Sequence, residues 1–462
     1  MFRPLVPDWS LVEVPWRGTC GISLAPGGNA ASLRLPSTMK SSREKLLTIA
    51  VTAAATAAVT VFIRNFISGE KKIKHRIAQR YGLSDPQFER AMSQLLGPPI
   101  LDGNEVTPLR NGIEIFPAML EAIGTAERSI TFETFVYWSG EIADHFAEAL
   151  AAKARAGVKV HVLMDGFGCD CTDGDAIRSM RDAGVELELY HMTSFARTNH
   201  RTHRKLLVID GKVGFTGGVG ISDLWDGNAD SPEHYRDSHY RVEGPVVAQM
   251  QAAFLDNWMK TRAVVLHGND YFPKLEAAGS RRCQMFKSSP MEGSESARLM
   301  YLLSIAAAEH SIKVGNAYFI PDDLTAQTLI EAAQRGVSVE VLLPGPNLDS
   351  MLVRAASRHR WGPLLKGGVR IFEYQPTMYH CKSMTIDGLW TSVGSANFDN
   401  RSFRINDEAN LNIIGREFAE EEERQFEKDK RDAIEVTYEA WSRRPVGQRV
   451  AGAVATLVRS QL

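Results

Sequence analysis

No excess of charge of either sign is present in this sequence of 462 residues. It contains 53 Lys and Arg against 55 Asp and Glu, a formal net charge of −2. Proteins that bind nucleic acid generally carry a basic excess, because phosphate contacts dominate their affinity. The balance therefore argues against DNA or RNA as a substrate. The length suits two domains and an extension.

Cysteine is also scarce. The five cysteines are an odd number and are scattered along the chain, which does not indicate a disulfide framework. Cys169 and Cys171 form one C-x-C pair without the second pair that a zinc site of this kind needs. We therefore expect reduced thiols, typical of a reducing compartment, and no bound metal.

The N-terminal part contains one long uncharged segment. Residues 1–38 are rich in Pro, Gly and Ser and are predicted to be a disordered extension. Residues 46–63 carry no charge and are long enough to cross a bilayer, although a buried Ala-rich helix or a secretory signal are alternatives. We predict a transmembrane helix there. More Lys and Arg follow this segment than precede it, which favours cytoplasmic catalytic domains.

The rest of the chain is an internal repeat. AERSITFETFVYW (126–138) matches AEHSIKVGNAYFI (308–320), and ARAGVKVHVLMDG (154–166) matches AQRGVSVEVLLPG (333–345). Each copy alternates strand and helix patterns, so we predict an α/β fold with two similar α/β/α sandwich domains. Their expected bounds are 100–265 and 281–445, and a pseudo-two-fold axis would bring matching loops face to face.

Each repeat ends in a segment with the same polar residues. The segments are THRKLLVIDGKVGFTGGVG (202–220) and YHCKSMTIDGLWTSVGSAN (379–397). Strand alternation puts the His and Lys of each pair on one face, so two facing pairs supply two imidazoles and two ammonium groups. That set suits phosphate-ester chemistry, in which one imidazole attacks phosphorus and the other protonates the leaving oxygen. The matching residues are His203, Lys205, Asp210 and Gly217 in the first repeat and His380, Lys382, Asp387 and Gly394 in the second.

Other positions in these segments are given supporting roles. Asp210 and Asp387 lie five residues past Lys, on the opposite strand face, so we expect them to accept hydrogen bonds from turn or backbone donors. Gly217 and Gly218 would let the backbone approach a phosphate closely. Asn397 can donate its amide to a phosphate oxygen.

The two HxKxxxxD motifs, followed by Gly-Gly or Gly-Ser, resemble the phospholipase D superfamily. The flanking segments FTGGVGISDLW, YRDSHYRVEGPVVAQMQAAF and GSANFDNRSF resemble bacterial cardiolipin synthases, over roughly residues 100–445. The resemblance implies a covalent phosphohistidine on His203, with His380 as acid and then base. The HxKxxxxD catalytic set also includes Asp210 and Asp387.

The resemblance further implies how phosphate and the histidines are held. Lys205, Lys382 and Asn397 would bind phosphoryl oxygens, with Ser395 nearby. A downstream carboxylate would orient each imidazole; Asp237 fits the first half and Glu408 the second, although each can also be an ordinary solvated charge. Gly220 occupies the first-half position that corresponds to Asn397, so phosphate binding is expected to be asymmetric.

These expectations lead to a predicted reaction. The protein would condense two phosphatidylglycerol molecules to cardiolipin and glycerol at the bacterial inner membrane, with no cofactor or metal because lysines replace the cation. A phospholipid hydrolase is the main alternative. A nuclease of the same fold is less favoured, since RAASRHRW (354–361) is its one candidate basic segment. The amphipathic tail 446–462 could lie at the membrane interface or pack on the domain.

Overall fold

The computed structural model describes residues 42–66, 75–77, 81–190, 199–289 and 296–456. The predicted extension 1–38 and the last six residues of the predicted tail lie outside the described residues. The chain divides into two units, Met1–Val59 and Thr60–Leu462, and each is considered by itself.

Helix α1 (Ser42–Phe66) contains the uncharged segment 46–63. A helix was expected here, and a helix forms. Nowhere in the described ranges, however, is a helix both long enough and apolar enough to cross a membrane, so the predicted transmembrane helix is not confirmed.

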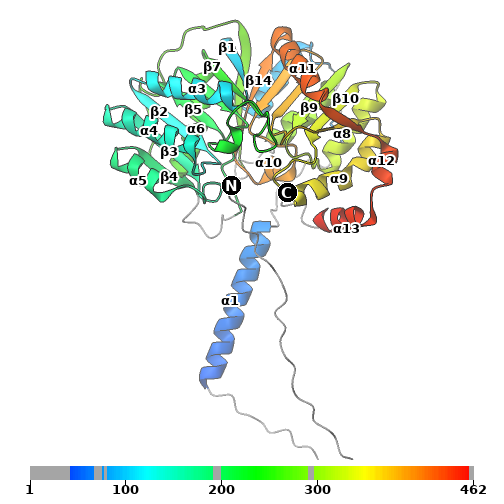
Figure 1. Cartoon of the computed structure of the whole chain (residues 1–462), viewed down its shortest axis with the longest axis horizontal. Coiled ribbons are helices and arrows are strands. Elements are labelled where there is room, and N and C mark those ends of the chain that lie inside the picture. Colours follow the sequence, from blue (N-terminus) through cyan, green and yellow to red (C-terminus); the bar gives the residue numbers. More distant parts are fainter. Residues whose placement is uncertain (1–41, 67–74, 78–80, 191–198, 290–295, 457–462) are drawn as a thin grey trace, which may run out of the picture. The chain divides into compact units, whose positions relative to one another are not determined.

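The second unit contains both repeats, and their elements follow the same order (Figure 1). The first half, residues 101–262, comprises β1 (Leu101–Arg110), α3 (Asn111–Thr125), β2 (Ser129–Thr134), α4 (Glu141–Arg155), β3 (Lys159–Asp165), α5 (Gly174–Asp182), β4 (Glu186–Tyr190), β5 (Leu206–Ile209), β6 (Val213–Gly217), η2 (Asp223–Trp225), β7 (Ser238–Glu243) and α6 (Val247–Arg262).

The second half, residues 281–430, comprises β8 (Arg281–Ser288), α7 (Ser296–Ala307), β9 (Ser311–Asn316), α8 (Asp323–Gln334), β10 (Ser338–Pro344), α9 (Met351–Lys366), β11 (Arg370–Tyr374), β12 (Lys382–Ile386), β13 (Trp390–Gly394), α10 (Asn400–Arg404), β14 (Glu408–Ile414) and α11 (Arg416–Lys430). Outside the repeats lie α2 (Pro86–Leu96), β15 (Ala433–Val436), α12 (Tyr438–Ser442) and α13 (Val446–Ala455).

The two halves share one sheet of 15 strands. Its order is β15-β11-β10-β9-β12-β13-β14-β8-β1-β7-β6-β5-β2-β3-β4. The first strands of the two halves, β1 and β8, pair antiparallel at the junction, with Leu101 opposite Cys283. The predicted α/β class and the duplication are therefore confirmed. The sequence did not indicate that the sheet runs on from one repeat into the other.

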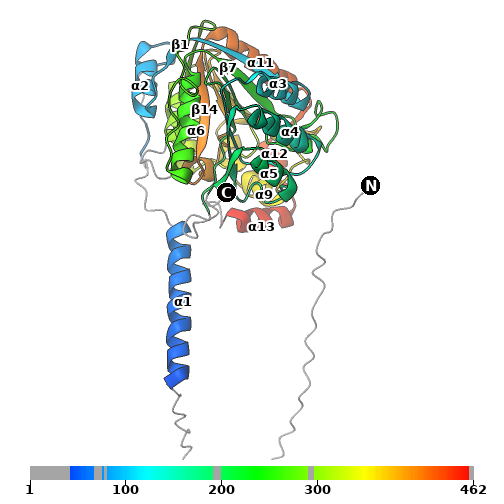
Figure 2. The same cartoon turned by 90° about the vertical axis from the view of Figure 1, so that its left-hand side faces the viewer.

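Helices cover the first half on both faces of its strands. Ile130 and Phe132 of β2 belong to a buried cluster with residues of α3 and α4. The alternate residues Thr131 and Glu133 hydrogen-bond instead to Gln251 and to Asn257 of α6. Since successive strand residues point to opposite faces, α6 lies across the sheet from α3 and α4 (Figure 2).

Candidate functional site

Both HxK segments lie where the two halves meet. The backbone N–H of His203 donates to the carbonyl of Asp407 at 2.9 Å, and that of His380 donates to the carbonyl of Arg236 at 2.8 Å. Each motif therefore pairs with the segment that leads into the last strand of the other half. This pairing brings the two motifs to one shared site.

The imidazoles are held by carboxylates from the opposite half. His203 Nδ1 lies 3.0 Å from Glu408 Oε2, and His380 Nδ1 lies 2.7 Å from Asp237 Oδ2. The sequence identified both carboxylates but matched each to its own half. The structure corrects that match, because each motif pairs with backbone of the other half. In each pair a neutral imidazole can donate from Nδ1 and keep Nε2 free as a base or nucleophile.

Further donors fix the two carboxylates. Ser395 and Ser402 donate their hydroxyls to Glu408. Trp225 donates its indole N–H to Asp237 Oδ2 at 2.9 Å. The Ser395 hydroxyl was expected near phosphate; it is committed to Glu408 instead and is fully buried. Ser395 therefore orients a carboxylate in this structure.

The motif lysines are buried beside the histidines. Lys205 Nζ and Lys382 Nζ each donate to the carbonyl of the preceding motif histidine at 2.8 Å. Burial, and then the charge of Lys382, lowers the pKa of Lys205 to about 7. Burial also lowers the pKa of Lys382. An anion placed between the two ammonium groups, such as a phosphodiester, would stabilise the charged form of both.

The same environment leaves the histidines neutral at pH 7. Burial and the charges of Lys205 and Lys382 lower the pKa of His203 to about 4, against the opposing effect of Glu408. Burial and Lys382 likewise lower the pKa of His380. A bound phosphodiester adds negative charge, which raises the pKa of a neighbouring imidazole. Substrate binding would therefore favour protonation of the histidine that serves as acid.

The motif aspartates lie away from the histidines. Asp210 sits in the turn between β5 and β6, and its carboxylate accepts the backbone N–H groups of Glu127, Arg128 and Ser129. The carboxylate of Asp387 makes the same kind of contact in the second half. Both carboxylates accept backbone hydrogen bonds, as the strand alternation predicted, and their inclusion among the catalytic residues stays a prediction.

In the second half the same arrangement recurs. Asp387 accepts the N–H groups of Glu309, His310 and Ser311 at 2.7–2.8 Å. Both aspartates have positive φ, 53° in each case. Each turn thus ties the motif hairpin to the start of the strand beside it.

The glycines after the first motif are required by packing. A Cβ on Gly217 would lie 2.6 Å from His239 Nδ1, and one on Gly218 would lie 2.4 Å from Asp237 Oδ1. These contacts, with β7 and with Asp237 just before it, account for both glycines without a phosphate. Asn397 is buried, and its Oδ1 has no hydrogen-bond partner among the described residues.

Two buried polar groups near the site were not predicted. Arg204, between the first His and Lys, is fully buried and bonds to Asp256 and to the carbonyl of Glu408. Glu133 accepts a hydrogen bond from Thr202, and burial raises its pKa to about 7. A signal for Glu133 was present, since a charge in the middle of a buried strand requires a partner.

The structure also places the thiols and the side chains that could bind a metal. Among the described residues, no cluster of three His, Cys, Asp or Glu side chains is placed to hold a metal ion. Cys169, Cys171, Cys283 and Cys381 are free thiols. Cys381 occupies the position that corresponds to Arg204 and lies against Ser238 at 3.7 Å.

Comparison with known proteins agrees with this geometry. A family described as cardiolipin synthase, PLD-like domain, matches residues 119–254 and 301–430. Cardiolipin synthase 1 of Bacillus anthracis is 31% identical over 374 residues, which cover 78% of this chain and 73% of that protein. Cardiolipin synthase A of Pseudomonas syringae pv. syringae (strain B728a) is 33% identical over 380 residues, which cover 80% of this chain and 78% of that protein.

A solved structure shows the same fold. The crystal structure of phosphatidylserine synthase from Haemophilus influenzae Rd KW20 matches with a TM-score of 0.64 and 13% sequence identity, over 81% of this chain and 100% of that chain. The family match includes both repeats, and the two relatives cover most of the chain. This chain therefore belongs to the cardiolipin synthase family of the phospholipase D superfamily, and it is a phosphatidyltransferase.

Proposed function

We propose that this protein transfers the phosphatidyl group of one phosphatidylglycerol to a hydroxyl of a second, forming cardiolipin and glycerol. The observation that carries the proposal is the pair of buried imidazole–carboxylate dyads, His203–Glu408 and His380–Asp237, each built from both halves. Together with two buried lysines, they supply a nucleophile, an acid and anion binding at one place.

The proposed reaction has two balanced steps. In the first, His203 Nε2 bonds to phosphorus while the bond from phosphorus to the glycerol oxygen breaks, and His380 gives its proton to that oxygen. In the second, a hydroxyl of the acceptor lipid attacks phosphorus, the phosphorus–nitrogen bond breaks, and His380 takes the hydroxyl proton. Lys205 and Lys382 hold the non-bridging oxygens in both steps, with Asn397 as a further donor.

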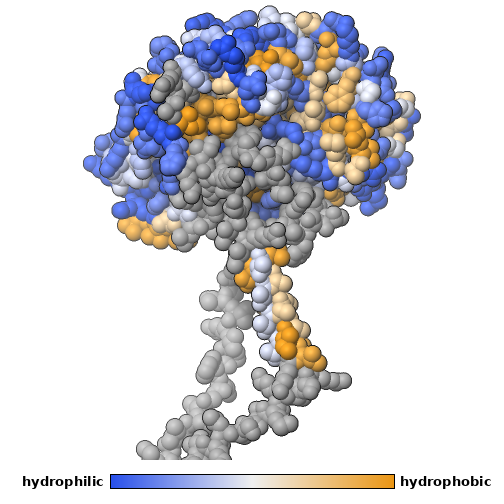
Figure 3. All heavy atoms as spheres, turned by 180° about the vertical axis from the view of Figure 1, so that it is seen from behind, coloured by the Kyte–Doolittle hydropathy of each residue, from blue (hydrophilic) through white to orange (hydrophobic). Residues whose placement is uncertain are grey.

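Access to lipid is part of this proposal, and α13 supports it. Gly452 and Ala455 pack against α9, whereas Val446, Val450 and Val454 are 72%, 56% and 59% exposed. Figure 3 shows a hydrophobic patch at the lower left, where α13 lies when the view of Figure 1 is turned by 180°. An exposed apolar stripe beside Arg449 suits the interface of an anionic bilayer. We place the site of action at the cytoplasmic face of the bacterial inner membrane.

Purified full-length protein tests the reaction. With phosphatidylglycerol in detergent micelles or vesicles, cardiolipin and glycerol should form in equal amounts, and EDTA should not change the rate. His203→Ala and His380→Ala should each lower turnover by about a thousandfold or more, because each removes a nucleophile or an acid. His145→Ala, an exposed histidine on α4, is the matched control and should remain active.

Two results would contradict the proposal. Formation of phosphatidic acid alone, at saturating lipid, would show that water is the acceptor and that the enzyme is a hydrolase. Complete loss of activity with EDTA would show that a metal ion takes part in the chemistry.

A further inference from the structure

The surroundings of the two motif histidines differ in charge. On the first-half side, the guanidinium of Arg201 lies over the ring of Phe167, 3.9 Å from its centroid. On the second-half side, the hydroxyl of Tyr318 donates to Asp349, which is an exposed carboxylate. Met378 stands at the second-half position that corresponds to Arg201, and Val136 stands at the first-half position that corresponds to Tyr318. The tyrosine that holds Asp349 therefore has no counterpart in the first half.

Asp349 belongs to a cluster around His380. The ring of Tyr235 lies 5.8 Å from the imidazole of His380, and the ring of Tyr318 lies 6.5 Å from it. The three members come from separate places: Tyr235 precedes β7, Tyr318 follows β9, and Asp349 lies between β10 and α9. Asp349 also raises the pKa of the Tyr235 phenol, after the larger effect of burial. The cluster therefore presents a carboxylate and two phenols beside one histidine.

The proposed reaction determines which part of the lipid meets this cluster. In an in-line displacement, the leaving oxygen lies opposite the attacking nitrogen. If His203 attacks phosphorus, the leaving headgroup oxygen faces His380. The headgroup of the donor lipid, and later the headgroup hydroxyl of the acceptor, thus lies on the side of Tyr235, Tyr318 and Asp349.

From this placement we infer that Asp349, Tyr318 and Tyr235 form a binding site for a vicinal diol, the free end of a glycerol headgroup. This inference rests on the proposed function. Asp349 Oδ2 takes the Tyr318 hydroxyl, while Oδ1 accepts no hydrogen bond from the described residues. Oδ1 and the Tyr235 hydroxyl are therefore available for the two hydroxyls of a diol.

A cationic headgroup fits this side less well. Lys382 and the imidazole of His380 already feel the charge of Asp349, which raises the pKa of both groups against their burial. The carboxylate thus has the ammonium group of Lys382 facing it across the site. Asp349 still has an acceptor oxygen available for a hydrogen bond, and a hydroxyl group supplies the donor for it.

The test compares two lipids with the same acyl chains. Phosphatidylglycerol carries the diol, and phosphatidyl-1-propanol lacks both hydroxyls. Release of the headgroup alcohol is measured with full-length protein in detergent micelles. Asp349→Ala should lower kcat/KM for phosphatidylglycerol about tenfold, the effect of losing a hydrogen bond to a charged group, and change that for phosphatidylpropanol less than about twofold. Tyr235→Phe should act in the same direction.

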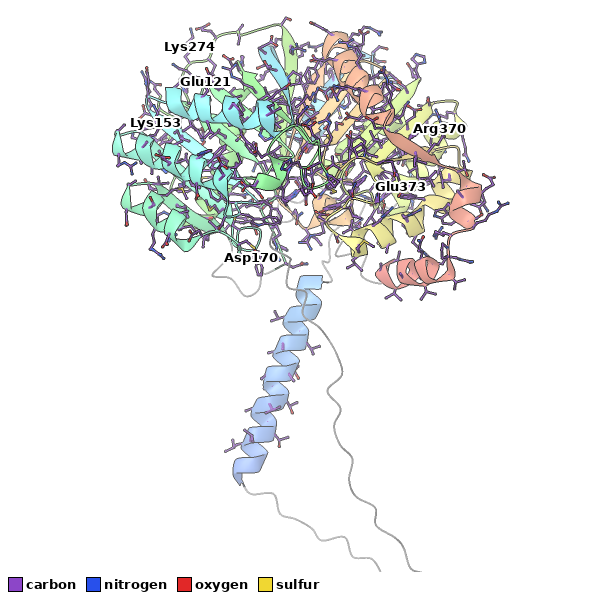
Figure 4. All side chains as sticks on the ribbon, viewed as in Figure 1. Glu121, Lys153, Asp170, Lys274, Arg370 and Glu373 are labelled. Carbon is purple, nitrogen blue, oxygen red and sulfur yellow. The ribbon has the colours of Figure 1, made fainter. Side chains whose placement is uncertain are left out.

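The first half provides a matched control. Asp170 is an exposed carboxylate in the loop between β3 and α5, which corresponds to the loop that carries Asp349 (Figure 4). Asp170→Ala should leave both substrates unchanged. Asp349 is also exposed, so its replacement by alanine should not affect folding, which circular dichroism checks.

Defined outcomes would overturn the inference. If Asp349→Ala lowers kcat/KM equally for both lipids, or for neither, Asp349 does not recognise the diol. A wild-type preference for phosphatidylethanolamine that Asp349→Ala abolishes would identify an ammonium site instead. Because the assay counts released headgroup, it works equally well if water is the acceptor, so failure of the transferase proposal remains distinguishable.

Discussion

At the scale of single residues, the two dyads reach similar geometry by different means. Glu408 has a longer side chain and receives two serine hydroxyls. Asp237 is shorter and receives an indole N–H from Trp225 and a backbone N–H from Ser238. The Trp225 ring also lies edge-on to His380, with centroids 5.2 Å apart. Trp225 therefore acts as a positioning residue for His380.

Trp225→Phe should change both rate and pH dependence. Loss of the indole donor leaves more negative charge on Asp237 Oδ2, which stabilises the protonated imidazole and raises the pKa of His380. The pH limb of kcat that belongs to His380 should therefore move to higher pH. Turnover should fall about tenfold as the hydrogen bond that orients Asp237 is lost.

Trp390→Phe is the control for this prediction. Trp390 is equally buried, but its indole N–H has no hydrogen-bond partner among the described residues. Its replacement should leave the pH profile of kcat unchanged. Identical profiles for Trp225→Phe and Trp390→Phe would show that Trp225 serves packing alone.

At the scale of elements, the motif hairpins are attached by their turns. The carboxylate of Asp387 accepts hydrogen bonds from three backbone N–H groups, which would otherwise lack a partner in the protein. Hydrogen bonds to a charged acceptor are stronger than those to water, so one acidic residue stabilises the start of β9 and the β12–β13 turn together. The recurrence of Asp in both motifs thus reflects folding of the hairpin.

Asp387→Asn should reduce stability more than catalysis. The amide keeps one acceptor and turns a donor group towards N–H groups, so we expect a loss of about 1–3 kcal/mol in the free energy of unfolding. The value of kcat, measured well below the melting temperature, should stay within about twofold of wild type, since a structural cap does not touch the reacting atoms. Thermal unfolding and initial rates check both parts.

Asp182→Asn, at an exposed position at the end of α5, provides the comparison and should change neither quantity. A fall in kcat by a factor of one hundred in a folded Asp387→Asn protein would return this residue to the catalytic set.

At the scale of the whole molecule, one sheet supports a site that neither half completes. His203 needs Glu408 from the second half, and His380 needs Asp237 from the first. The buried Arg204 adds a further link, because it bonds to Asp256 of the first half and to the carbonyls of Ser288 and Glu408 of the second. Neither half alone would contain a complete imidazole–carboxylate dyad, so the site forms only when both halves are packed together.

The outer surface gives a prediction at the same scale. If α13 lies in a lipid interface, hydrogen exchange of its backbone in full-length protein should slow when phosphatidylglycerol vesicles are added. Replacement of Val446, Val450 and Val454 together by Ser should abolish that protection and leave exchange in β5 and β12 unchanged. Because the measurement is local to α13, binding by another part of the chain does not produce the same result. Unaltered exchange of α13 with vesicles would exclude this contact.

The sequence by itself determined the duplication, the α/β class and the identity of the two HxK pairs. These follow from local periodicity and spacing, which can be recognised in a single sequence. Strand alternation also assigned Asp210 and Asp387 to backbone donors, because it places them away from the histidines. Glu408 and Asp237 were suggested by the resemblance to a known family rather than by a local pattern.

Only the tertiary structure decided which carboxylate serves which histidine. That choice depends on pairing between segments far apart in the sequence, His203 with Asp407 (204 residues apart) and Arg236 with His380 (144 residues apart), and no local pattern encodes it. The same holds for Ser395, whose hydroxyl turns to Glu408, and for Asp349, which reaches the site through a loop. Contacts between distant segments are set by how the two halves pack on one sheet, so they appear only when the chain is folded.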